Sequence, residues 1–263
     1  MSAKNKKQII ISLTSFPAAI SFAVHAIKSI LNGSVLPDKI VLYLTASQFP
    51  DRKIPAELAA LKGNQLFEVR FYEENIRSYT KLIPALKDFP DDIIITVDDD
   101  VLYHRNLLKS LLCCHKKYPD AIVGHRIRRI EADAEEIKPY LTWKLYKRHR
   151  YFTRSLKPSF RNMAIGVGGV LYPPHSLTEE MLDSKLFMQI APTVDDIWFY
   201  AAAIAKGTKI APVAFGYWRH KKLKKPDEIC LKNTNISSGV DVNCKVLKLI
   251  MEKYPVIKQR FEI

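Results

Sequence analysis

The sequence lacks any long run of apolar residues. It has 263 residues, of which 48% are hydrophobic, so it can bury a substantial core. The most apolar segments, 16–31 and 197–205, are interrupted by His25 and Lys28 or are too short to span a bilayer. The apolar run at 9–13 is likewise too short for the core of a signal peptide. We therefore expect a soluble, cytoplasmic protein that is not exported.

Cysteine is also scarce. The chain has four cysteines, at Cys113, Cys114, Cys230 and Cys244, and no two of them have the C-x-x-C spacing. This argues against a zinc ribbon and against a thioredoxin-like redox site. Cys113 and Cys114 lie in an apolar stretch that has a helical pattern. We interpret them as thiols that fill the core in a reducing compartment.

Acidic residues are few for a chain with this many bases. There are 27 Asp and Glu against 41 Lys and Arg, which gives a net charge of +14. A basic surface attracts nucleic acids, anionic lipid headgroups or phosphorylated substrates. The bases concentrate in two clusters, 144–161 and 219–225, and the first is interleaved with aromatic residues. We expect these clusters to make peripheral contact with an anionic membrane, and a solvated basic face is the alternative.

Strand and helix patterns alternate along the first two-thirds of the chain. Strands are predicted at 8–13, 39–45, 67–72, 93–97 and 121–124, and helices at 17–32, 55–62, 80–87 and 103–117. The run at 93–97 is continuously apolar and β-branched, which is typical of a central strand in a parallel sheet. This alternation predicts an α/β fold with a mainly parallel, Rossmann-like sheet flanked by helices.

The later part of the chain departs from this rhythm. The basic segment 126–162 has no clear pattern and is predicted to leave the sheet. A glycine-rich strand near 166–172, a helix at 195–206 and a strand at 209–215 follow, and a basic loop then leads to a helix at 240–254. We expect a single domain, 1–263, built from the parts 8–125, 126–162, 163–220 and 221–263.

Three consecutive carboxylates, Asp98, Asp99 and Asp100, follow the apolar strand at 93–97. Ligands of open α/β sheets bind at the carboxyl ends of strands, and adjacent anions repel one another unless a cation compensates them. In an extended chain, Asp98 and Asp100 would share one side and could hold Mg²⁺ or Mn²⁺ together with a diphosphate. The alternative is a polar turn that caps the next helix.

A second acidic pair, Asp195 and Asp196, opens the predicted helix at 195–206. Acids in a first helical turn are stabilised by the helix dipole, so the pair could be only a cap. Trp198 would place an apolar wall beside Asp196, and desolvation would raise the pKa of that carboxyl towards the range of a general base. We predict that Asp196 is a catalytic base and that Asp195 positions it.

Glycines and isolated basic residues supply weaker signals. Gly166, Gly168 and Gly169 allow close backbone approach but lack the G-x-G-x-x-G spacing of a dinucleotide site. They predict either a tight loop under a substrate or a bend in the sheet. Lys81 could contact a phosphate, and His220 could bind a metal ion or a phosphate, but an isolated basic residue is more often a solvated side chain.

Taken together and in order, five segments resemble bacterial glycosyltransferases of the GT-A fold, which build capsular and other surface polysaccharides from nucleotide sugars. The segments are 10–17, 79–82, 97–100, 166–172 and 195–198. The similarity covers about residues 8–220. It implies a nucleotide-sugar-binding half at 8–125, an acceptor and catalytic half at 163–220, and a Mn²⁺ or Mg²⁺ ion.

The resemblance also implies a role for each motif. The donor would be a UDP-linked sugar, and the acceptor a hydroxyl of a glycan or of a lipid-linked glycan. With Asp196 as the base and no second carboxylate placed as a nucleophile, we expect inversion at the sugar. The implied roles are nucleotide pocket for Thr14 and Ser15, donor contact for Lys81, metal and diphosphate for Asp98 and Asp100, ribose for Asp99, acceptor for Gly168 and Gly169, and base for Asp195 or Asp196.

Two other functions remain open from the sequence. Residues 98–102 also resemble the nucleophile motif of haloacid-dehalogenase phosphatases, with Asp98 as nucleophile and Asp100 as acid. That motif usually opens its domain, whereas here a long α/β pattern precedes it. The net charge suggests a nucleic-acid-binding protein. No recognition motif accompanies that charge, and an acidic triplet would repel phosphates, so no nucleic-acid partner is expected.

Overall fold

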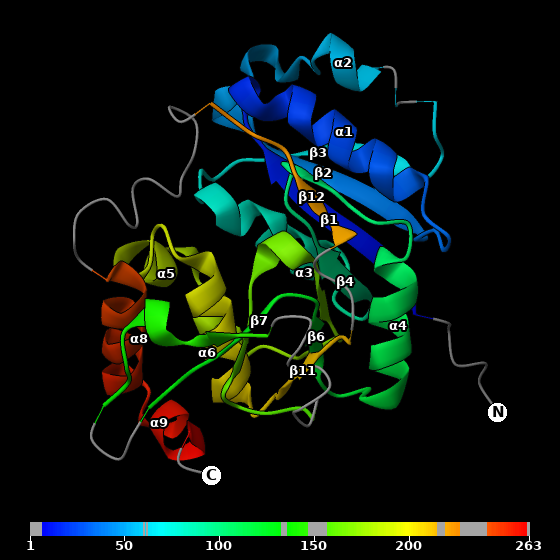
Figure 1. Cartoon of the computed structure of the whole chain (residues 1–263). Coiled ribbons are helices and arrows are strands. Elements are labelled where there is room, and N and C mark those ends of the chain that lie inside the picture. The colour runs from blue at the N-terminus through cyan, green and yellow to red at the C-terminus, as the bar shows by residue number, and fades with distance from the viewer. Residues whose placement is uncertain are drawn as a thin grey trace, which may run out of the picture.

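The computed structural model describes residues 7–59, 61, 63–132, 136–146, 157–214, 219–226 and 241–261. Within them, seven strands form one sheet in the order β11-β6-β10-β4-β1-β2-β3, with helices on both faces (Figure 1). Only β10 runs antiparallel to its neighbours, β4 and β6. The predicted α/β class with a mainly parallel sheet is confirmed. The strands are β1 (Ile9–Ser15), β2 (Lys39–Thr45), β3 (Phe67–Tyr72), β4 (Ile93–Thr96), β6 (Ile122–Gly124), β10 (Val170–Tyr172) and β11 (Ile210–Pro212).

The apolar strands separate two hydrophobic cores, one on each face of the sheet. Along β1, Ile10 contributes to one core and Ile11 to the other, because successive side chains point to opposite faces. One core packs against α1 (Ile20–Leu31), α2 (Ala56–Ala59) and α4 (Leu107–Lys117). The other packs against α3 (Ile83–Asp88), α5 (Ser184–Ile190), α6 (Asp195–Lys206), α8 (Val242–Lys253) and α9 (Pro255–Phe261).

Most predicted elements are present, and some differ at their ends. β2, β3 and α6 have the predicted bounds. The helix after β1 begins with a 3-10 turn, η1 (Pro17–Ala19), before α1. The predicted helix at 80–87 is divided into the 3-10 turn η4 (Arg77–Lys81) and α3. The last helix is followed by α9, which the pattern did not predict separately.

The segment after β6 forms a sheet of its own. β7 (Ile127–Arg129), β8 (Lys144–Leu145) and β9 (Asn162–Ala164) pair antiparallel in the order β8-β7-β9. Much of the basic cluster at 144–161, from 147 to 156, lies outside the described residues, as does 227–240 of the predicted loop. None of the helices in the described ranges has the length and apolar character needed to cross a bilayer.

The strand order has a topological switch point at the carboxyl edge of the sheet, which is where the ligand crevice of an open α/β sheet lies. From β1, the chain adds β2 and β3 on one side and β4 on the other. The direction of winding therefore reverses between β1 and β4, and ligands of open α/β sheets bind at such a switch point. Ser15 ends β1 and Asp98 follows β4, so two of the predicted motifs meet at this crevice.

Candidate active site

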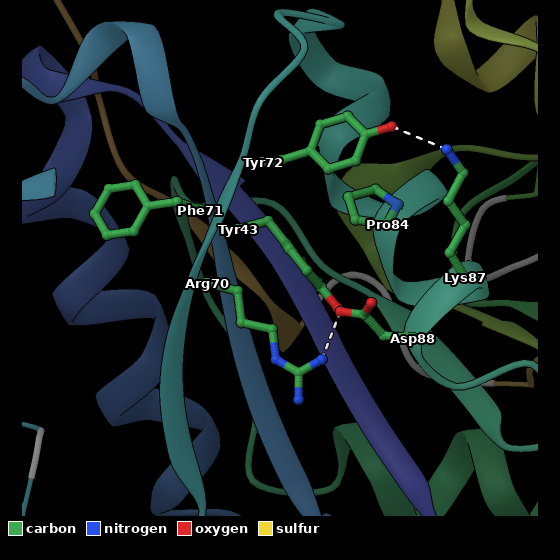
Figure 2. A pocket seen from close by; sticks show the side chains of 7 residues that line it. All are labelled: Tyr43, Arg70, Phe71, Tyr72, Pro84, Lys87 and Asp88. Atoms are coloured by element: carbon green, nitrogen blue, oxygen red, sulfur yellow. Dashed lines mark hydrogen bonds and ion pairs between the residues drawn. The ribbon is translucent and has the colours of Figure 1, made fainter.

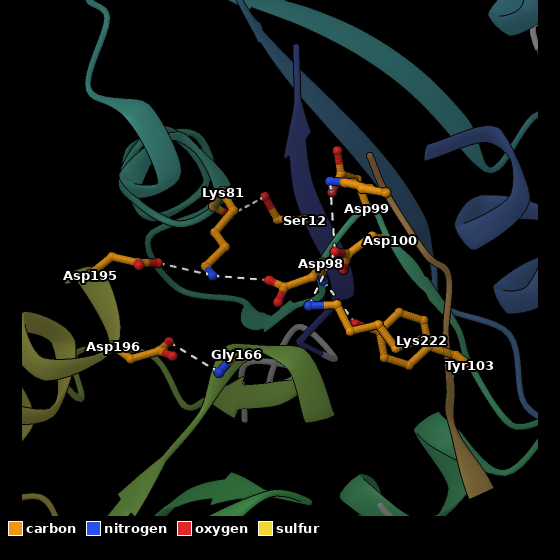
Figure 3. A network of polar contacts seen from close by, with 11 residues as sticks. Ser12, Lys81, Asp98, Asp99, Asp100, Tyr103, Gly166, Asp195, Asp196 and Lys222 are labelled. Atoms are coloured by element: carbon orange, nitrogen blue, oxygen red, sulfur yellow. Dashed lines mark hydrogen bonds and ion pairs between the residues drawn. The ribbon is translucent and has the colours of Figure 1, made fainter. Parts of the chain in front are cut away.

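The acidic triplet does not continue the strand that precedes it. β4 ends at Thr96, and Asp99 and Asp100 form a turn that leads into β5 (Val101–Leu102). The backbone N–H of Asp98 donates to the hydroxyl oxygen of Tyr103 at 2.8 Å, which holds the start of this turn. Strand alternation therefore does not orient the three carboxylates, and each contacts a lysine from another segment (Figure 3).

Lys81 joins the triplet to the second acidic pair. Its Nζ lies 3.0 Å from Asp98 Oδ1 and 2.9 Å from Asp195 Oδ2, and its own carbonyl accepts a hydrogen bond from Ser12 Oγ at 2.6 Å (Figure 3). Burial alone would lower the pKa of Lys81, but the carboxylates of Asp195 and Asp98 outweigh it and raise that pKa well above its usual value. Lys81 is therefore a permanent cation between two acids.

Asp195 and Asp196 stand in the first turn of α6 but have different surroundings. Asp195 is paired with Lys81, whereas Asp196 Oδ1 accepts the backbone N–H of Gly166 at 3.0 Å. Burial, and then the charge of Asp195, raise the pKa of Asp196 to about 7, although Lys81 opposes the rise. Asp196 can therefore exchange a proton near neutral pH, which is the property that a general base requires.

The predicted apolar wall of Asp196 is made by other residues. Trp198 is fully buried, its Nε1 donates to the carbonyl of Met181 at 2.7 Å, and it is not among the residues that line a small void beside Asp196. That void is instead lined partly by Tyr172 and Phe199. These aromatic side chains limit the access of water to the carboxyl group.

The absence of a side chain at Gly166 leaves space for Lys81 and Asp196. A Cβ at this position would lie 2.7 Å from Lys81 Nζ and 3.1 Å from Asp196 Oδ1, so a side chain here would displace the network. The two glycines expected near an acceptor lie elsewhere in the same loop. Gly168 packs against the backbone of Arg126, and Gly169 adopts a positive φ of 81°. The sequence indicated the glycine-rich loop but did not single out Gly166.

The two hydroxyl residues at the end of β1 have different hydrogen-bond partners. Ser15 Oγ donates to Asp99 Oδ2 at 2.6 Å, and Thr14 Oγ1 donates to the carbonyl of Tyr43 at 2.9 Å. A serine before a helical pattern is often an N-cap, but Ser15 does not cap the turn that follows it. The N-cap position of η1 is Phe16, and no side-chain hydrogen bond caps this turn. Ser15 belongs to the triplet, whereas Thr14 lies beside it on β1.

The basic cluster at 219–225 contributes to the site. Lys225 Nζ lies 2.6 Å from Asp99 Oδ1 and 3.8 Å from Asp100 Oδ2, and its side chain is only 8% exposed. Lys222 Nζ lies 3.5 Å from Asp100 Oδ2. Burial raises the pKa of Asp99, and Lys225 and Ser15 oppose the rise. Lys225 faces the triplet, so it cannot serve the membrane contact expected for this cluster.

The carboxylates of the triplet are suitable ligands for a divalent ion, but in this structure they form ion pairs with lysines. The carboxylate oxygens of Asp98 and Asp100 are the ligands that Mg²⁺ and Mn²⁺ prefer. Each is paired with a lysine, and across the described ranges no three His, Cys, Asp or Glu side chains are gathered in a metal-binding group. An ion held there would require Lys222 to move away from Asp100, with water or substrate completing its coordination.

A larger cavity, of about 390 Å³, lies apart from these residues against β2, β3 and α3 (Figure 2). Its polar groups bind one another. Tyr43 donates to Asp88 at 2.8 Å, Arg70 donates to the same carboxylate at 2.5 Å, and Lys87 donates to Tyr72 at 3.1 Å. None of the residues predicted for the site lines it. The acids and Lys81 at the crevice are therefore the better candidate for chemistry.

Comparison with known proteins adds no relative on which to base a function. No protein-family model matches the chain, and the search of curated proteins found no match to its sequence.

Proposed function

We propose that the chain is a glycosyltransferase. It transfers a sugar from a nucleotide-diphosphate donor, in the first instance UDP-linked, to a hydroxyl of a glycan or lipid-linked glycan during surface polysaccharide synthesis. The observation that carries the proposal is one polar network at the switch point of the sheet. It runs from Asp98 through Lys81 to Asp195, with Asp196 beside it. This network places Lys81, a cation that could bind a phosphate, near Asp196, a carboxyl whose pKa is raised.

The fold is compatible with this proposal. A mainly parallel sheet with one antiparallel strand, β10, is consistent with the GT-A fold implied by the sequence. The switch point between β1 and β4 is where a nucleotide would bind, and Ser15 and Asp99 are joined there by a hydrogen bond. The net charge of +14 suits an enzyme that works at the inner face of an anionic membrane.

On the donor side, the chain has to bind and stabilise a diphosphate. Lys81 is held as a cation at the crevice, and its charge would stabilise the departing nucleoside diphosphate. Asp98 and Asp100 would hold Mn²⁺ or Mg²⁺, which when bound supplies further positive charge to this leaving group. Lys81 also fixes Asp98 and Asp195 in position through its two ion pairs.

On the acceptor side, Asp196 acts as the general base. The acceptor hydroxyl loses its proton to the carboxylate of Asp196, and its oxygen forms a bond to the anomeric carbon. The bond between that carbon and the diphosphate breaks, and the nucleoside diphosphate leaves with the electron pair. A single displacement of this kind inverts the anomeric centre. Asp195 is engaged by Lys81 and positions the helix terminus from which Asp196 projects.

A ligand panel tests the proposal. UDP-, GDP-, CMP- and dTDP-sugars are added with and without Mn²⁺, and the melting temperature is measured, because a ligand that binds the native state raises it by mass action. We expect one UDP-sugar to raise the melting temperature of the wild-type chain, and Lys81→Met to abolish the rise. Lys87→Met, at an exposed lysine in α3 rather than in η4, is the matched control.

Two results would contradict the proposal. If none of the nucleotide sugars changes the melting temperature, the crevice is not a donor site. If the chain instead hydrolyses a phosphomonoester such as p-nitrophenyl phosphate and loses this activity in Asp98→Asn, the phosphatase alternative is correct.

A further inference from the structure

The segment 219–226, here called the strap, is attached to the acidic triplet and to the residues that directly follow it. Its strand β12 (Lys221–Lys222) pairs antiparallel with β5, which directly follows the triplet. The N–H of Leu223 donates to the carbonyl of Asp100 at 2.7 Å. His220 Nδ1 accepts the N–H of His104 at 3.0 Å, and its ring packs edge-on against Tyr103 at 5.1 Å. The strap is thus held against the triplet by its backbone.

Lys225 extends from the strap into an enclosed site. Its ammonium is paired with Asp99 at 2.6 Å and lies 5.6 Å from the ring centre of Phe16 and 5.9 Å from that of Phe22. Both side chains of the pair are about nine-tenths buried, at 8% and 10% exposed. A surface lysine that met Asp99 by chance would not be enclosed by two aromatic rings. The contact is therefore part of the folded structure.

The strap completes the charge balance of the triplet. Lys81 pairs with Asp98, while the two strap lysines, Lys222 and Lys225, serve Asp99 and Asp100. A divalent ion bound by Asp100 would lie close to both strap ammonium groups. Its repulsion would be screened least at Lys225, whose side chain is 8% exposed, and more at Lys222, whose side chain is 55% exposed. The ion and the strap lysines therefore compete for the same carboxylates.

We propose that the strap is a counter-ion latch, in which Lys225 and Lys222 neutralise Asp99 and Asp100 until a divalent ion displaces them. This inference rests on the proposed function, because it assumes a metal ion at the triplet. Its consequence is that the free chain binds metal weakly, and that metal binding withdraws Lys225 from its enclosed position. The latch thereby couples occupancy of the triplet to the position of the strap.

The first experiment measures Mn²⁺ binding to the full chain by electron paramagnetic resonance of the free ion. Lys225→Met removes the charge and keeps an aliphatic stem between Phe16 and Phe22. We expect it to tighten Mn²⁺ binding about tenfold or more, because one repelling charge is lost. Lys225→Arg keeps the charge and should match the wild type. Lys224→Met, an exposed neighbour in the strap, should change the affinity less than about twofold.

The second experiment uses the wild-type chain alone, so it does not depend on the folding of any variant. Lysines are acylated with a water-soluble ester in the presence and absence of Mn²⁺, and the rate at each lysine is measured by mass spectrometry. Mn²⁺ should raise the rate at Lys225 about tenfold, because burial slows reaction at an enclosed amine. The rate at the exposed Lys224 should not change.

The outcomes separate the latch from the proposed function. Equal Mn²⁺ affinity in the wild type and Lys225→Met, or a Lys225 acylation rate unchanged or lowered by Mn²⁺, would overturn the latch and leave the proposed metal site in place. Failure of both chains to bind Mn²⁺ would overturn the metal site itself, and the latch with it. Binding of a UDP-sugar, measured separately in EDTA, reports on the donor site in either case.

Discussion

Removal of the Lys81 ammonium should destabilise the protein more than removal of any exposed lysine ammonium would. Lys81→Met keeps a chain of similar length but leaves Asp98 and Asp195 without their shared cation. Breaking a buried ion pair from one side costs about 3–5 kcal/mol. Asp195 is only 13% exposed, whereas Asp98 is 27% exposed and can recover some hydration. We therefore expect a loss near the lower limit, about 3 kcal/mol in the free energy of unfolding near pH 8.

The size of this loss should depend on pH. Burial and Asp195 raise the pKa of Asp196 to about 7, and Lys81 limits the rise. A carboxyl whose pKa is raised by folding costs stability increasingly as the pH rises from its unfolded pKa to its folded pKa, and the full cost applies above the folded pKa. Without Lys81, the ionised form of Asp196 costs still more. The deficit of Lys81→Met should therefore be larger near pH 8 than near pH 5.5, where Asp196 is protonated in both proteins.

Urea unfolding followed by circular dichroism measures both effects, with the m-value checked for constancy. Lys87→Met is the control, because this exposed lysine in the neighbouring helix α3 contacts Tyr72, through a hydrogen bond and its ring, and has no ion pair to a carboxylate among the described residues. Its free energy of unfolding should change by less than about 0.5 kcal/mol at either pH. The reasoning is refuted if the two variants lose equal stability, or if the deficit of Lys81→Met is the same at both pH values.

Three further predictions concern activity. Asp196→Asn should lower the turnover number by about 10²- to 10⁴-fold, with the melting temperature nearly unchanged. In the wild type, kcat/KM should fall as the pH decreases below about 7, because Asp196 becomes protonated. A larger effect of Asp195→Asn would reverse the two roles. EDTA and Asp100→Asn should each abolish transfer without unfolding the chain, and full activity in EDTA would refute the metal site. Gly166→Ala places a methyl group 2.7 Å from Lys81 Nζ, so it should weaken UDP-sugar binding measured by calorimetry; affinity equal to that of the wild type would show that the loop can move aside.

Much of the fold could be read from local patterns. β2, β3 and α6 have the predicted bounds because their apolar residues follow the strand or helix period, and because Gly207, with a φ of 95°, ends α6. The antiparallel direction of β10 was not predicted. An apolar strand of three residues carries no mark of direction, and its partners β4 and β6 lie far away in the sequence.

The candidate site was only partly visible in the sequence. The acidic motifs stood out because carboxylates directly follow or open apolar elements, whereas Lys81 was a weak signal alone and received a role only from the resemblance. The enclosure of Lys225 could not be predicted, since its partner Asp99 is 126 residues away and the basic cluster resembles a solvated surface. The same is true of Trp198, whose proximity to Asp196 in sequence suggested contact, whereas the turn of the helix directs it into the core.

The sequence by itself determined the alternation of strands and helices, the charge of the chain and the presence of two acidic motifs at element ends. These features depend on residues close together in the chain, so local periodicity and chemistry specify them. Only the tertiary structure decided which cation faces which carboxylate, and which buried groups raise the pKa of Asp196. Those properties depend on burial and on distances of a few ångströms between segments that the fold brings together.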